Sequence, residues 1–247
     1  MKRWSRRILF AACLLVMLIL TGSLAYGREA LRAEHDPSTR GITVYNESGA
    51  QVAKMSVPGG SINQQIASNK SYIYVTVRFE KDNTFQNYIY RYGRKKGKLT
   101  KLKKLPEGFI DFYINDLIGD VLYLSGQASS PSKLVGCTYD IKKKKLKKLK
   151  AEDVGFDQHY GAYYVMSGKL TAGEFYRYPI YLYQFEKRKA TKLCEYSDCY
   201  TIIGKYLYYS SAEKKGFAKD SPHQIIRVDL NTGKKLPSIL IDVERPS

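Results

Sequence analysis

A phrase that recurs four times constrains the fold of this chain most. Each copy contains two strands rich in aromatic residues, then a basic turn and a strand of Lys and Leu; the copies begin at Ser71, Asp120, Gly161 and Lys205. They are 49, 41 and 44 residues apart, which matches one four-stranded propeller blade and exceeds the period of leucine-rich or ankyrin repeats. The repeat therefore predicts an all-β fold, a β-propeller of about four complete four-stranded blades.

A shorter match precedes the four copies. Residues 41–57 form two alternating segments around a turn at residues 46–49, which predicts a hairpin equivalent to the outer half of a blade. Too few residues follow Asp242 to supply the two inner strands. We therefore expect an incomplete arc of five positions, with an open strand edge at residues 42–45. A fragmentary chain, or a four-bladed ring with the hairpin as an added outer layer, are the alternatives.

The first 27 residues are typical of an export segment. Four cations precede an unbroken apolar run at residues 8–20, and small residues follow it, as in a signal peptide. This run is too short to cross a bilayer as a hydrophobic helix, but residues 8–26 are long enough to act as a membrane anchor. The segment is expected either to be cleaved as a signal peptide or to be retained as a membrane anchor. In both cases the rest of the protein lies outside the cytoplasm.

The segment boundaries follow from these assignments. Residues 1–27 are expected to be the signal peptide or signal anchor, and residues 28–40, which are polar and contain Pro37, a linker or short helix. Residues 41–247 are expected to form one propeller domain, because the repeat continues without a break in composition.

The last repeat carries the clearest likeness to a known group. The segment IIRVDLNTGKKL, residues 225–236, together with the preceding YLYY, resembles the TolB-like, YVTN-like and PQQ-like repeats of extracytoplasmic bacterial β-propellers. The resemblance covers residues 41–242 and implies the fold, but no single function, because members of the group bind quinones, peptides, glycans or proteins. The one Trp is Trp4, whereas quinone-binding repeats place a Trp in each blade, so we expect no cofactor.

Basic residues are concentrated in the turns and outer strands of the repeats. Four segments without any acid hold 20 cations, among them Lys95, Lys96, Lys142, Lys143, Lys144, Lys145, Lys187 and Arg188. The repeat should carry them to one face as a cationic arc that attracts an anionic surface polymer or lipid headgroups. The alternative is that Lys on outer strands prevents edge-to-edge aggregation. Nucleic acid is not an expected partner, because the protein is exported and the cations are not interleaved with aromatic residues.

Three residues are candidates for a ligand site at the channel mouth: Asp116, Asp157 and His159. A strand places residues two apart on one face, so Asp157 and His159 should lie together and could orient a base or a metal ligand. A hydrogen-bonded polar pair is the alternative. No further ligand with suitable spacing accompanies them, and nucleophile, phosphate-loop and calcium-loop motifs are missing, so we expect no metal site.

Outside the export segment the chain has three cysteines, Cys137, Cys194 and Cys199. Cys194 and Cys199 flank a short connection between two blades, and in an oxidising compartment they could form a disulfide. They could equally stay unpaired, because consecutive blades are offset and the Cα atoms must come within about 7 Å.

These features favour a non-enzymatic binding or interaction module of the bacterial cell surface. Its expected partner is an anionic surface polymer, lipid headgroups or another surface protein. The second hypothesis is a hydrolase or lyase that acts on cell-wall or extracellular glycans through Asp116, Asp157 and His159. Carboxylates that cluster at one channel mouth would favour the enzyme, and scattered ones would favour the binding module.

Overall fold

The computed structural model describes residues 30–128, 133–151, 154–168, 178–197, 199–211 and 223–241. The expected signal peptide or anchor at residues 1–27 lies outside these ranges. Within them, no helix is long and apolar enough to span a membrane.

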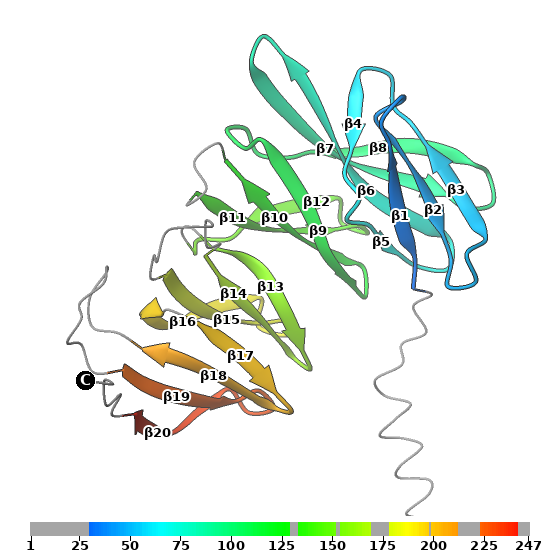
Figure 1. Cartoon of the computed structure of the whole chain (residues 1–247). Helices are drawn as coiled ribbons and strands as arrows, with labels where there is room; N and C mark the ends of the chain where they lie inside the picture. Colours follow the sequence, from blue (N-terminus) through cyan, green and yellow to red (C-terminus); the bar gives the residue numbers. More distant parts are fainter. Residues whose placement is uncertain are drawn as a thin grey trace, which may run out of the picture.

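Five antiparallel sheets follow one another along an open arc (Figure 1). The first sheet has three strands. In each of the other four, the last three strands come from one copy of the repeated phrase, and the inner strand comes from the residues just before that copy. The predicted propeller of four blades and a partial leading sheet is confirmed. Strands β9, β13 and β17 are the inner strands of their blades and lie along the concave side of the arc (Figure 1).

The strands have the following bounds. The leading sheet contains β1 (Arg32–Asp36), β2 (Gly41–Tyr45) and β3 (Gln51–Met55). Blade 1 contains β4 (Gly60–Ile62), β5 (Ala67–Ser68), β6 (Tyr72–Lys81), β7 (Thr84–Gly93) and β8 (Lys98–Lys104). Blade 2 contains β9 (Asp111–Ile118), β10 (Val121–Gln127), β11 (Leu134–Asp140) and β12 (Lys145–Lys148). Blade 3 contains β13 (Gly155–Tyr160), β14 (Tyr163–Ser167), β15 (Tyr178–Gln184) and β16 (Lys189–Ser197), and blade 4 contains β17 (Tyr200–Ile203), β18 (Tyr206–Ser211), β19 (His223–Asp229) and β20 (Lys234–Ile241).

The leading sheet differs from the prediction. Residues 32–36, expected to belong to a linker or short helix, form β1, which pairs with β2 in antiparallel register. Strand β2 is therefore paired on both sides, with β1 and with β3, and the predicted open edge at residues 42–45 is wrong. The sequence RAEHD of β1 has no apolar alternation, and Ala33 is its one residue packed against the apolar core. As an edge strand, β1 pairs with β2 alone among the described strands.

Apolar clusters join each sheet to the next. Ile42 and Val44 of the leading sheet pack with Ile73 and Val75 of blade 1, and similar clusters lie at the following interfaces. Strand β14, the second strand of blade 3, lies between blades 2 and 4 and is buried along its whole length. In the outer strand β8 the Lys side chains are exposed and the two Leu side chains are half-buried. Burial on both faces explains why the second strands read as nearly continuous apolar and aromatic runs.

A hydroxyl residue recurs at the same place in every second strand. It is Thr76, Ser125, Ser167 or Ser210, the fifth residue of YIYVT, VLYLS, YYVMS and YLYYS. Thr76 Oγ1 donates to the backbone oxygen of Phe112 in the next blade at 2.5 Å. Ser125 Oγ accepts from the backbone N–H of Phe156 at 2.8 Å and donates to its carbonyl oxygen at 3.2 Å. These buried bonds hold the inner strand of one blade against the second strand of the preceding blade.

Candidate functional site

Two β-bulges shape the concave wall between blades 2 and 3. In β9 the register against β10 shifts so that Asn115 is an extra residue between Ile114 and Asp116. In β13 the register against β14 shifts in the same way, and Asp157 is the extra residue. A bulge turns the following side chains relative to an ordinary strand. The bulges therefore give Asn115 and Asp157 equivalent positions on two neighbouring inner strands.

Asp157 links blade 3 to blade 4. Its Oδ2 atom accepts a hydrogen bond from Ser167 Oγ at 2.9 Å and another from the hydroxyl of Tyr200. Burial and the bond to this carboxylate raise the pKa of Tyr200, so the hydroxyl keeps its proton and remains a donor. Both donors reach the same oxygen, and Oδ1 has no donor among the described residues. Asp157 is exposed, so this oxygen is open to solvent or to a ligand.

Asn115 holds the facing strand through its amide. Its Nδ2 atom donates to the backbone oxygen of Phe156 at 2.8 Å, which fixes the orientation of the amide group. Its Oδ1 atom is buried and has no hydrogen-bond partner within the described part of the chain. A buried acceptor without a donor costs stability unless water or a ligand supplies one.

A cavity of about 390 Å³ opens beside these residues. Its lining comes from blades 1, 2 and 3 and consists of Gln65, Tyr113, Asn115, Ser125, Gln127, Leu134, Gly155, Phe156, Asp157, Ser167, Gly168 and Tyr178. Amide and hydroxyl groups dominate this set, and Asp157 is the one ionisable acid in it. Such a lining offers many hydrogen bonds and little charge, which suits a neutral polar ligand.

The structure separates Asp157 from His159. His159 Nδ1 lies 3.3 Å from Asp116 Oδ2 of blade 2, and its ring stacks on Tyr164, whereas Asp157 contacts Tyr200 of blade 4. The expected shared face for Asp157 and His159 is wrong, because the bulge inserts an extra residue between Phe156 and Gln158 and changes the alternation. The structure does bring Asp116 and His159 together.

The Asp116–His159 pair is held by further contacts. His159 Nε2 lies 3.0 Å from the backbone oxygen of Gly161, and Asp116 Oδ1 accepts from the N–H of Leu117 at 2.7 Å. Both ring nitrogens of His159 thus face oxygen acceptors. In the ranges that the structure describes, no three His, Cys, Asp or Glu residues are grouped as a metal site would require. This geometry is that of a structural polar pair between two blades.

Sequence reasoning missed the polar groups that surround Asp157. Gln65 and Gln127 were not candidates, although both line the cavity, and neither was Ser167, which donates to the carboxylate. The repeated hydroxyl at the end of each second strand was the available signal. The glutamines stand outside the repeated phrase and left no comparable pattern.

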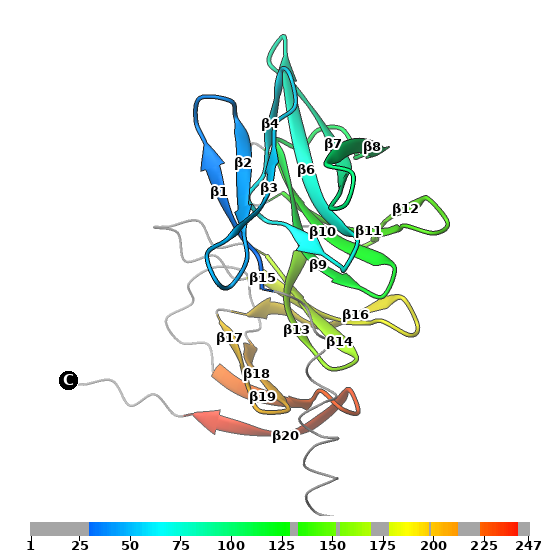
Figure 2. The same cartoon turned by 90° about the vertical axis from the view of Figure 1, so that its right-hand side faces the viewer.

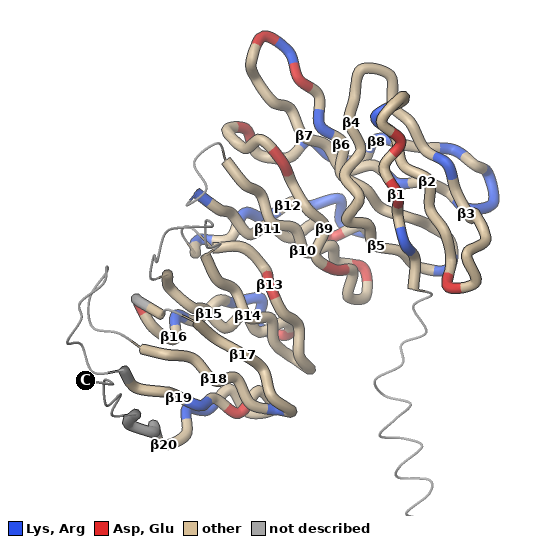
Figure 3. Tube along the Cα trace, viewed as in Figure 1, with Lys and Arg blue, Asp and Glu red and all other residues tan. Residues whose placement is uncertain are grey.

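The predicted polyanion-binding residues lie in the turns before the outer strands, except Lys145, which is the first residue of β12 (Figure 3). Lys95 and Lys96 are in the turn before β8, and Lys187 and Arg188 are in the turn before β16. In the turn before β12, Lys142 Nζ forms an ion pair with Asp120 Oδ2 at 2.6 Å, and Lys144 adopts a φ of 52°. The turns before β12, β16 and β20 project on the same side of the arc (Figure 2).

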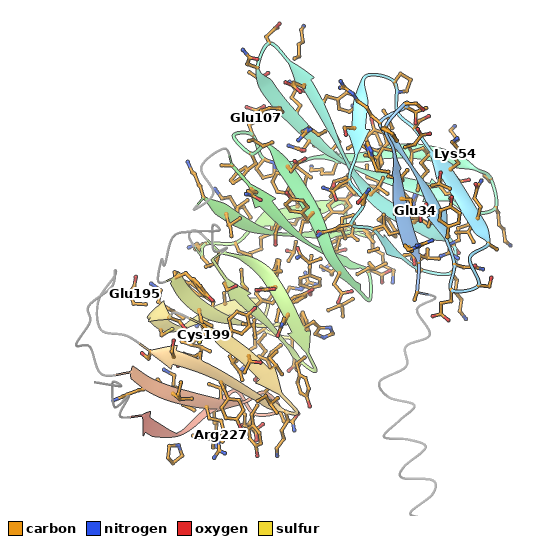
Figure 4. All side chains as sticks on the ribbon, in the orientation of Figure 1. Glu34, Lys54, Glu107, Glu195, Cys199 and Arg227 are labelled. Atoms are coloured by element: carbon orange, nitrogen blue, oxygen red, sulfur yellow. The ribbon has the colours of Figure 1, made fainter. Side chains whose placement is uncertain are left out.

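The three cysteines outside the export segment are free thiols in the structure, so Cys194 and Cys199 are not bonded. Cys194 pairs with Ile180 inside blade 3, and Cys199 lies at the start of blade 4, where its backbone N–H donates to Ser210 Oγ (Figure 4). Burial raises the pKa of Cys194 to about 11 and that of Cys137 to about 12.

We expect Cys199 to be alkylated at least about tenfold faster than Cys194 at pH 8, because the thiolate is the reactive form and Cys199 is exposed. A time course with iodoacetamide, read by mass spectrometry of the peptides, measures both rates. Unfolded protein is the control, in which the three sites should react alike. Similar rates in the folded protein, or a peptide that links Cys194 to Cys199 without reductant, would contradict this arrangement.

Comparisons with known proteins leave the family open. No family model matches the chain, and no curated protein matches it. An oligogalacturonate lyase in complex with manganese aligns with 83% of this chain and 63% of its own, at 10% identity and a TM-score of 0.49. TolB from Acinetobacter baumannii aligns with 83% of this chain and 51% of its own, at 14% identity and a TM-score of 0.44.

A third similar structure is the β-propeller domain of the Trilobed protease from Pyrococcus furiosus, described as having an open velcro topology. It aligns with 76% of this chain and 59% of its own, at 10% identity and a TM-score of 0.44. The chain spans between about half and just under two thirds of the length of these three solved proteins.

Proposed function

We propose that this propeller is a non-enzymatic binding module of the bacterial cell surface, and that its ligand occupies the cavity between the inner strands β9 and β13. The observation that carries the proposal is the Asp157 carboxylate. Two donors occupy its Oδ2 atom, and its Oδ1 atom has no donor among the described residues, in a residue that lines the cavity. A charged acceptor gains most from a ligand that brings a hydrogen-bond donor.

The lining favours a neutral ligand with several hydroxyl groups, such as a segment of a glycan. Gln65 and Gln127 can each donate and accept, and the tyrosine rings provide flat apolar surface beside the polar groups. Asp157 would repel an acidic group at close range. A cavity of about 390 Å³ falls within the range of small-molecule sites.

The surface location rests on the sequence. The export segment at residues 1–27 and the likeness of residues 225–236 to extracytoplasmic repeats both support it. Secretion and retention by residues 8–26 as an anchor both fit a protein that meets wall polymers, lipid headgroups or other surface proteins.

The arrangement of these residues fits ligand binding better than cleavage of a glycan by a hydrolase or a lyase. A catalytic acid and base must reach the same substrate bond. Asp157 contacts blade 4, whereas Asp116 and His159 are engaged with each other and with backbone groups between blades 2 and 3. The three residues therefore do not form a set that shares one substrate position.

The variant Asp157→Asn tests the proposal. The side-chain oxygen of the asparagine can still accept hydrogen bonds from Ser167 and Tyr200. Its NH2 group takes the place of Oδ1, so an acceptor in the cavity becomes a donor. We expect binding of neutral oligosaccharides from bacterial wall material to weaken at least about tenfold, because a hydrogen bond to a charged group contributes about 1.5–3 kcal/mol. Gln65→Ala, which changes an exposed lining residue, should weaken the same binding several-fold.

Calorimetry with a panel of neutral oligosaccharides measures this binding. Gln51→Ala on β3 is the matched control, because it removes an exposed glutamine that does not line the cavity. Equal affinity of Asp157→Asn and the unchanged protein would overturn the proposed site. Release of reducing sugar that stops in His159→Gln would favour the enzyme instead.

A further inference from the structure

A second cavity, of about 260 Å³, lies between blades 2 and 3, beside β12 of blade 2 and the turn that follows β15 of blade 3. It shares no lining residue with the concave cavity. The residues around it are Val121, Tyr123, Thr138, Asp140, Lys143, Lys145, Lys147, Tyr183 and Arg188. Four of these side chains are cationic and one is acidic.

Strand register explains why the cations of blade 2 converge. Tyr123 pairs with Thr138, and Thr138 pairs with Lys147, so these three residues form one row across β10, β11 and β12. Val121, Asp140 and Lys145 form a second row two residues away. Residues two apart in a strand share a face, so both rows lie on the same face of blade 2.

Blade 3 supplies the opposite wall. Tyr183 is on β15, and Arg188 lies in the turn before β16 with a φ of 49°. Arg188 Nη2 is 3.6 Å from Asp140 Oδ2, and Asp140 Oδ1 accepts from the backbone N–H of Lys143 at 2.9 Å. The carboxylate therefore holds the basic turn of blade 2 and the arginine of blade 3 beside each other.

We propose that this cavity binds a phosphoryl group. Lys143, Lys145, Lys147 and Arg188 surround one space with four positive charges, and Asp140 already has partners for both of its oxygens. A phosphoryl group offers three or more oxygens to these donors, more than a carboxylate does, and the planar fork of an arginine matches two of them.

Hydroxyl groups add neutral donors to the same space. Thr138 lines the cavity with Tyr123 and Tyr183, both of which are buried. Burial raises the pKa of each tyrosine, so both hydroxyls keep their protons at neutral pH. The site therefore combines mobile lysines with donors that the core holds in place.

The cavity shows which of the basic residues we expect to bind an anion. Lys143, Lys145 and Arg188 of the predicted set line the cavity, together with Lys147, whereas Lys142 is paired with Asp120 outside it. At the corresponding place in blade 1, where Arg91 pairs with Tyr74 as Thr138 pairs with Tyr123, the guanidinium of Arg91 lies 4.4 Å from the centre of the Tyr72 ring. The number of cations in a turn therefore does not tell the turns apart. The side chains packed around each turn do.

Paired charge removals test the site. The double variant Lys145→Gln/Lys147→Gln removes two exposed cations from the cavity, and Lys95→Gln/Lys96→Gln removes two from the turn of blade 1. The probes are inorganic phosphate, glycerol 3-phosphate, a soluble poly(glycerol phosphate), and vesicles of phosphatidylcholine with and without phosphatidylglycerol. We expect the cavity variant to lose at least about tenfold in affinity and the control to change less than about twofold.

The different probes identify the molecule that carries the phosphoryl group. Loss confined to vesicles with phosphatidylglycerol would assign a lipid headgroup, and loss confined to the soluble polymer would assign a wall polymer; both support the site. Arg188→Lys, which keeps the charge but not the fork, should show an intermediate loss. Thermal unfolding of each variant separates lost binding from lost structure. Equal losses in the two double variants, or no binding of any phosphoryl probe by the unchanged protein, would overturn the proposal, and neither result bears on the concave cavity.

Discussion

Replacing Tyr123 with Ala is expected to lower the free energy of unfolding by about 3–5 kcal/mol, the usual cost of removing a buried aromatic ring. Tyr123 is 4% exposed, and its ring lies 5.2 Å from the rings of both Phe156 and Phe185, between centroids. Tyr164 and Tyr183 also face it. Loss of this ring opens a void at the interface of blades 2 and 3. Urea denaturation followed by circular dichroism measures the change.

Tyr208 provides the matched control for this prediction. It has the same position in the fourth repeat as Tyr123 has in the second, but no described sheet follows blade 4, and Tyr208 is only half-buried. Tyr208→Ala should therefore cost less than about 1 kcal/mol. Similar losses in both variants would show that the aromatic cluster between blades 2 and 3 does not contribute more to stability than the half-buried ring of Tyr208.

The contrast between Tyr123 and Tyr208 shows what the repeat can predict. Its period and its strand pattern were sufficient for the four blades and their order, because each copy describes the last three strands of one sheet with their turns. The pattern assigns the same strand position to both tyrosines. It does not say which of them lies between two sheets, because that depends on neighbours from other copies.

The sites were harder to predict than the fold for a related reason. Because Asp157 is an extra residue in β13, His159 contacts Asp116 and not Asp157. The alternation of residues along a strand does not predict where a bulge will occur. Strand β1 was missed because its polar residues pair with β2 without burying an apolar face. The sequence was sufficient to recognise the basic turns. It could not show that Lys147 lines a cavity and Lys142 does not, because that cavity also needs Arg188 from the neighbouring blade.

Gly126→Ala is expected to destabilise the protein by about 1–3 kcal/mol, because blade 2 has no space for the added methyl group. A Cβ atom at Gly126 would lie 2.5 Å from Phe112 Cε1 and 2.9 Å from Val135 Cγ1. Phe112 is 1% exposed, so its ring cannot move into solvent. Either the ring must leave its rotamer or β9 and β10 must separate, and both responses disturb the contact with blade 1, where Phe112 accepts the hydrogen bond of Thr76.

Gly93→Ala separates this steric effect from the general effect of replacing a glycine in a strand. Gly93 lies at the end of β7, and the nearest atoms to its added Cβ, Lys98 O and Tyr72 Cε1, are both 3.9 Å away. This change should be neutral or stabilise slightly, because Ala restricts the unfolded chain more than Gly does. In the double variant Gly126→Ala/Phe112→Leu the smaller side chain removes the close contact with the Phe112 ring, so the combined loss should be less than the sum of the two single losses. Additive losses, measured by the same urea denaturation, would mean that the added methyl group and the Phe112 ring do not compete for the same space.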